Sequence, residues 1–185
     1  SDPMQMMAGR VEPPGVFLNA SAVIERQMTA FCLDAWVAGG VDASAIPDRL
    51  KSVIDNVEKG DLRSFPYNYI KFVKTGAEDL RERFLDLFKG ELSERTVEYI
   101  GHFLLGDPQT SAGLEQRLIN KLFELVKERK GLKKRIESLK RGMEKLQKGP
   151  QDEATLDEIA QIQNERGGLQ AILREINARQ TLNFM

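Results

Sequence analysis

Apolar residues recur every three or four positions along this chain and seldom alternate, and this spacing is typical of helices. The first such segment begins near Ser21, where Asn19-Ala20-Ser21 is better interpreted as a helix cap than as a glycosylation site, and it ends at Gly39-Gly40. A second helix is predicted over residues 47–58, with Gly60 after it. The pattern therefore predicts an all-α protein.

Three more short helices are predicted before the break at Gly106-Asp107-Pro108. Residues 64–75 would suit a strand by their Tyr and Ile content, but their 4,3,1 apolar spacing and Pro66 favour a helix. Residues 77–89 form the next helix, and Ser93 caps the last one. We therefore expect a compact bundle of short helices over residues 21–108.

Residues 1–20 are expected to form a flexible arm. They contain Pro13-Pro14-Gly15, and they begin with Ser1-Asp2-Pro3, which is typical of a cloning remnant. We therefore expect the chain to be a fragment of a longer protein.

A different pattern starts at Leu118, where apolar residues keep a strict 4,3 spacing that is interrupted only by Arg129. The corresponding helix, residues 111–148, would be roughly 55 Å long at 1.5 Å per residue, so it needs a partner to cover its apolar stripe. Such a partner follows the Gly149-Pro150 break. Its apolar stripe comprises Leu156, Ile159, Ile162, Leu169, Leu173 and Ile176. We therefore expect residues 109–185 to form a long antiparallel helical hairpin after the bundle.

Charge is distributed unevenly, although the formal net charge of the chain is only −1. Residues 127–151 are strongly basic, whereas the first half of the return helix carries Asp152, Glu153, Asp157, Glu158 and Glu165. Exposed pairs contribute only about 0.2–1 kcal/mol each, so we expect charge to select the antiparallel pairing while apolar burial stabilises it. Nucleic-acid contact stays open as an alternative, although the stretch lacks aromatic residues for base stacking. Its candidate residues are Lys133, Lys134, Arg135, Lys140 and Arg141.

Nothing in the sequence indicates catalysis. Cys32 is expected to be a buried, inert thiol, and His102 has no nucleophile or carboxylate at a suitable spacing. The aromatic cluster of Tyr67, Tyr69 and Phe72 is explained by core packing. We expect no catalytic residue, metal, cofactor or small-molecule substrate, no membrane segment, and a cytoplasmic location.

The C-terminal segment carries more apolar residues than one stripe requires, and Gly167-Gly168 is a natural place for its helix to bend. We therefore predict that this end of the hairpin is a protein-docking surface. The alternative is that the tail folds back or is unstructured. The candidate partner-binding residues are Leu169, Ile172, Leu173, Arg174, Ile176, Asn177, Leu182 and Phe184.

The layout resembles the C-terminal helicase-binding domain of bacterial DNA primases. The most similar part is the long-helix segment LEQRLINKLFELVKERKGLKKRIESL, together with the polar break GPQDEAT before a Gln/Glu-rich final helix. The resemblance implies a helical subdomain followed by a hairpin that docks on the replicative DNA helicase. The glycines at 131, 142, 167 and 168 depart from the family pattern. Two other function classes stay open, namely a scaffold that dimerises through the hairpin seam and a basic nucleic-acid-binding domain.

Overall fold

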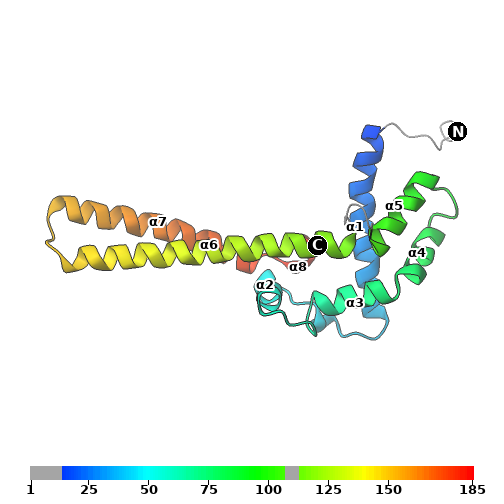
Figure 1. Ribbon diagram of the computed structural model, residues 1–185, viewed down its shortest axis with the longest axis horizontal. Helices are drawn as coiled ribbons and strands as arrows, with labels where there is room; N and C mark the ends of the chain where they lie inside the picture. The colour runs from blue at the N-terminus through cyan, green and yellow to red at the C-terminus, as the bar shows by residue number, and fades with distance from the viewer. Residues whose placement is uncertain (1–13, 107–112) are drawn as a thin grey trace. The chain divides into compact units, whose positions relative to one another are not determined.

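The computed structural model describes residues 14–106 and 113–185, and within them it contains helices and no strand (Figure 1). The protein is all-α, as the apolar spacing predicts. Its contacts divide it into two compact units. The first comprises the described residues of Ser1–Ile46 and Asp61–Asn120 with Met185, and the second comprises Pro47–Gly60 and Lys121–Phe184.

The first unit is a bundle of short helices around an aromatic core. That core contains the ring cluster of Trp36, Phe65 and Tyr69, whose centroids lie 5.7–6.2 Å apart. The helix α1 contacts the next three bundle helices, α3, α4 and α5. The elements of this unit are α1 (Pro14–Ala38), η1 (Ala43–Ala45), α3 (Tyr67–Thr75), α4 (Ala77–Asp86), α5 (Glu94–Leu105) and the first turns of α6 (Leu114–Lys148).

The helix α1 begins at Pro14, seven residues before the predicted start at Ser21. Proline suits the first turn of a helix, because its missing N–H would have no partner there, so Pro13-Pro14-Gly15 does not prevent helix formation. The arm expected over residues 1–20 is therefore helical from Pro14 onward. Its first 13 residues lie outside the described part of the chain.

Local signals placed most other helix ends correctly. Gly60 adopts φ 68°, the left-handed conformation of a helix terminator, and the Thr96 N–H donates to Ser93 Oγ over 3.2 Å at the start of α5. The segment at 64–75 is helical, so its strand interpretation is excluded. The helix α4 ends at Asp86, before the predicted residue 89, because Lys89 turns the chain with φ 49°.

The second unit contains the predicted hairpin. Figure 1 shows α6 and α7 (Glu153–Ala178) running side by side, joined by a short turn at Gly149-Pro150. The turn is closed by side chains: Gln151 Nε2 lies 2.8–3.2 Å from three carbonyl oxygens at the end of α6, and Asp152 Oδ1 accepts the Thr155 N–H over 2.8 Å. These contacts satisfy backbone groups that a helix end otherwise leaves unpaired.

The seam between α6 and α7 differs from the prediction at two positions of α7. Leu156 is 52% exposed, whereas its neighbour Thr155 is half-buried. Arg166, which we left out of the seam, is half-buried and has a fully buried Nε. The seam positions of α7 therefore follow a 4,3 spacing through Thr155, Ile159, Ile162, Arg166, Leu169, Leu173 and Ile176.

The helix α2 (Leu50–Lys59) belongs to the second unit, although we expected it in the bundle of residues 21–108. Its buried residues, Leu50, Val53, Ile54 and Val57, form one face, and α2 packs against α7. The sequence pattern gives the apolar face of a helix without naming the element that the face covers. Which unit α2 belongs to therefore depends on its contacts with residues far away in the sequence.

The C-terminal tail folds back, which was the alternative to a free docking tail. After α7, the short helix α8 (Thr181–Phe184) is preceded by an antiparallel bridge between Arg49 and Gln180. The helix α7 itself continues through Gly167-Gly168 without a break. These glycines therefore do not interrupt the helix.

Candidate interaction site at the base of the hairpin

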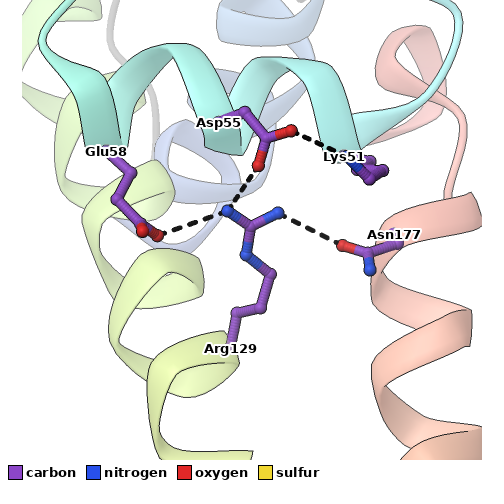
Figure 2. Close-up of polar contacts among 5 residues, drawn as sticks. All are labelled: Lys51, Asp55, Glu58, Arg129 and Asn177. Atoms are coloured by element: carbon purple, nitrogen blue, oxygen red, sulfur yellow. Dashed lines mark hydrogen bonds and ion pairs between the residues drawn. The ribbon is translucent and has the colours of Figure 1, made fainter. Parts of the chain in front are cut away.

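Arg129 occupies a seam position of α6, where the apolar spacing predicts a leucine or isoleucine, and the residue is only 2% exposed. Figure 2 shows its guanidinium between α2 and α7. Its Nη2 lies 2.6 Å from Asp55 Oδ1 and 3.2 Å from Glu58 Oε1, and its Nη1 donates to Asn177 Oδ1 over 3.4 Å. One buried cation thus connects three helices of the second unit.

The surroundings of Asp55 favour its ionised form. Burial raises the pKa of Asp55, but hydrogen bonds from Lys51 and Arg129 and their charges outweigh that effect, so the pKa lies below its usual value. Lys51 Nζ is 2.9 Å from Asp55 Oδ2. Burying an arginine costs desolvation energy, and acidic partners such as Asp55 offset that cost. The acids of α2 therefore stabilise the buried position of Arg129.

The tail completes this end of the hairpin, which we call the base. The Leu50 N–H donates to the Arg179 carbonyl over 2.8 Å, and the Thr181 N–H donates to the Asp48 carbonyl over 2.9 Å. Arg49 Nη1 also donates to the Ala178 carbonyl over 3.0 Å. The N-terminus of α2 and the end of α7 are therefore held together by backbone as well as side-chain contacts.

The predicted partner-binding residues do not form one surface. Ile176 is 1% exposed and Asn177 is bonded to Arg129, so both belong to the interior of the base. Phe184 is half-buried, with Lys121 Nζ 4.6 Å from its ring centroid. Ile172 and Leu182 are exposed, at 43% and 64%. Of the others, Arg174 is exposed, and Leu169 and Leu173 are half-buried in the seam.

The five basic residues singled out as nucleic-acid contacts are all exposed, but they do not share one environment. Arg135 Nη2 lies 3.0 Å from Glu165 Oε2 on α7, and Arg141 Nη1 lies 3.7 Å from Glu137 Oε1 on its own helix. Lys133, Lys134 and Lys140 form no ion pair with the described residues. The acidic return helix therefore neutralises only part of the basic arm.

Arg129 visibly interrupts the apolar spacing of the sequence, but that spacing alone assigns it no role. A charged residue at a seam position is itself a signal, because a buried charge requires partners of opposite sign. Asp55 and Glu58 lie on a helix far earlier in the chain, and no spacing rule connects the two segments. Their role becomes visible only in the structure.

Catalytic chemistry has no support in the described residues. Burial raises the pKa of the Cys32 thiol to about 12, against a smaller opposing effect from Arg83, and His102 is exposed on α5. The parts of the chain that the structure describes contain no group of three or more His, Cys, Asp or Glu that could hold a metal ion. Within the same ranges, none of the helices is both long and apolar enough to cross a membrane.

No family model matches this chain, and neither a curated protein nor a solved structure does so. The resemblance to the helicase-binding domain of primases therefore stays a prediction.

Proposed function

We propose that this chain is a non-catalytic protein-interaction domain whose hairpin docks on a partner protein. The observation that carries the proposal is the contrast within the second unit between the base and the distal arms. At the base, Arg129 and the folded-back tail fix the hairpin through contacts with α2. Beyond α2, the arms extend side by side and expose most of their residues (Figure 1). A hairpin anchored in this way presents its outer surfaces with little loss of conformational entropy on binding.

The partner that we propose to test first is the replicative DNA helicase of the source organism. The support is the layout of a helical bundle followed by a long antiparallel hairpin, which resembles the primase domain that docks on that helicase. In this proposal the domain couples primer synthesis by a longer parent protein to DNA unwinding in the cytoplasm. In this proposal the chain described here contributes binding and no chemistry.

The proposal is tested with a hairpin that is shortened without disturbing its base. Deleting residues 137–143 and 159–165 removes one heptad from each arm, about 10 Å of helix, and keeps the apolar register of both helices. The contacts of Arg129 lie outside both deletions. We expect the variant to stay folded by circular dichroism and to lose binding to the purified helicase, measured by fluorescence anisotropy.

A matched control separates the loss of length from the loss of stability. Arg135→Gln breaks the exposed ion pair with Glu165 but keeps the hairpin length, and it is expected to bind as the unaltered chain does. If the shortened variant binds the helicase as tightly as the unaltered chain, or if the unaltered chain does not bind it, the proposal is wrong.

A second candidate function is binding to the phosphate backbone of a nucleic acid. Lys127, Lys134, Arg141 and Lys148 recur every seven residues of α6 and so lie on one face of the helix. All four are exposed, which makes the face strongly basic. The test is a salt titration of duplex DNA binding, since phosphate contacts require the affinity to fall steeply with salt. An affinity that does not depend on salt rejects this candidate.

A further inference from the structure

The two sides of the hairpin differ in how their charges are matched. On one side, Arg135 of α6 pairs with Glu165 of α7. On the other side, Lys133 and Lys140 of α6 have no such partner among the described residues. We call this second side the lysine face. It is defined by residues that share a helix face through steps of three, four or seven. These are Arg129, Lys133, Ile136, Lys140 and Met143 of α6, and Leu156, Gln163, Arg166, Gln170, Leu173 and Asn177 of α7.

At the base, α2 already covers the start of the lysine face. Its carboxylates reach Arg129, which leads the face on α6, and Arg129 also bonds Asn177, which ends it on α7. Val126, one turn before Arg129, is only 7% exposed. The helix α2 is therefore a bound amphipathic helix within the same chain, with apolar residues for the seam and two acids for the buried Arg129 guanidinium.

Beyond α2, the lysine face continues with the same chemistry, but no helix of the described residues in the second unit covers it. Ile136, Met143 and Leu173 are half-buried, so part of each apolar side chain stays accessible, and Leu156 is 52% exposed. The lysines at 133 and 140 border these residues on α6. The face thus combines an incompletely covered apolar strip with unmatched positive charge.

Arg166 repeats the position of Arg129 on the opposite arm. Both are arginines at seam positions, and each has a buried Nε without a hydrogen-bond partner. Arg129, however, also reaches the two acids of α2. Arg166, in contrast, forms no ion pair with any of the described residues. The acids of α2 contact Nη2 of Arg129 and not its Nε, so a carboxylate supplied from outside would pair in the same way with the charged guanidinium of Arg166.

We infer that the lysine face binds an acidic amphipathic helix of a partner protein, end to end with α2. The inference rests on the proposed function, because it names the chemistry of the partner segment. Continuity with the α2 contact and the charge of Lys133, Lys140 and Arg166 specify a helix with apolar residues at 3,4 spacing and acids beside them. A nucleic acid would satisfy the charges and leave Ile136, Met143 and Leu156 uncovered, so the face favours a protein helix.

The probe is a fluorescein-labelled peptide with two tandem copies of the α2 sequence, Leu50–Lys59, in which glutamine replaces lysine. One added glutamine between the copies makes the repeat 11 residues long, which is about 20° from three whole helical turns, so the apolar residues and both acids of each copy stay on one face. A control peptide carries lysine in place of the acids. We expect anisotropy to show binding of the acidic peptide, with hydrogen exchange of α2 unchanged because the peptide lies beyond α2.

Charge reversal then locates the site. The double substitution Lys133→Glu and Lys140→Glu is expected to weaken binding of the acidic peptide about tenfold, which corresponds to about 1.4 kcal/mol, and to permit binding of the lysine peptide. The matched control, Lys134→Glu with Lys148→Glu, changes the net charge equally on the outer face of α6 and is expected to change the affinity less than about twofold.

The inference is overturned if the acidic peptide does not bind, if both double variants weaken it equally, or if α2 loses its exchange protection when the peptide binds. It is also overturned if the lysine reversals weaken binding to duplex DNA while the peptide shows none. The two proposals can fail separately. If the shortened hairpin loses helicase binding but the lysine reversals change neither peptide binding nor helicase binding, the proposed function stands and the lysine face is rejected as the site. Retained helicase binding by the shortened hairpin rejects the proposed function and leaves the peptide result to stand on its own.

Discussion

Arg129 Nη2 lies 2.6 Å from Asp55 Oδ1, so a seam residue of the hairpin is neutralised by a helix from an early part of the chain. The arginine side chain is almost fully buried, whereas Asp55 is 27% exposed. The pair is therefore asymmetric: removing the acid leaves a buried cation, and removing the arginine leaves a carboxylate that water can still reach. This asymmetry determines which substitutions matter.

Replacing Arg129 by alanine should lower the free energy of unfolding by about 3 kcal/mol, because it removes both the packing of a buried side chain and the partner of Asp55 and Glu58. Arg129→Met keeps most of the volume without the charge and should cost less than about 1.5 kcal/mol. Urea unfolding followed by circular dichroism measures both. Equal losses for the two variants would mean that charge, rather than volume, governs this position.

Acid should loosen α2 from the hairpin through Asp55. The pKa of Asp55 in the folded protein is lowered, so its ionised form contributes stability that is complete above the unfolded-state pKa of about 3.9 and is lost as the pH falls through the lower folded-state pKa. The difference in unfolding free energy between the unaltered chain and Asp55→Asn should therefore be constant near neutral pH and shrink below about pH 4. A difference that grows toward acid pH would contradict the assignment.

The glycines of the hairpin should be replaceable. A Cβ placed at Gly131, Gly167 or Gly168 meets no atom within 4 Å, and all three lie inside helices. Each Gly→Ala substitution should raise the free energy of unfolding by about 0.5–1 kcal/mol, because alanine loses less backbone entropy on folding. Gly60→Ala is the control and should be destabilising by about 1–2 kcal/mol, since its φ is 68°. A destabilising effect at Gly167 would indicate that α7 bends there.

Cys32 should resist thiol reagents in the folded protein. Its side chain is fully buried, and its pKa of about 12 leaves almost no thiolate at about pH 8, the form that reacts. We expect labelling by a disulfide reagent only when urea unfolds the first unit, so the rate should follow the unfolding transition. Rapid stoichiometric labelling without denaturant would show that α1 opens readily.

The sequence predicted the helices and the hairpin because their signals are local. Periodic apolar residues, Ser93, Gly60 and the Gly149-Pro150 break each act over a few residues, and the structure confirms the elements that they indicated. The errors at helix ends have equally local causes. Pro13-Pro14 could end one segment or begin the next, and the residues alone do not distinguish the two.

The candidate site could not be predicted in the same way, because its parts come from distant segments. Arg129 was recognised as unusual, but its acids on α2 were assigned to the bundle. Ile176 and Asn177 were expected to face a partner, and they face the base of the hairpin. Which of two apolar faces meets which depends on tertiary packing, and helical periodicity is the same in either case.

The second unit is discontinuous in sequence, since residues 61–120 lie between α2 and the rest of it. Ordering α2 on the hairpin therefore closes a long loop, which costs entropy and tends to slow the folding of this unit. A fragment that begins at residue 109, where the sequence suggests a domain boundary, would contain Arg129 without the acids that neutralise it. Any experiment on the isolated hairpin would thus report on a molecule whose Arg129 has lost its acidic partners. To keep these partners, α2 must be joined to the hairpin fragment by a new linker.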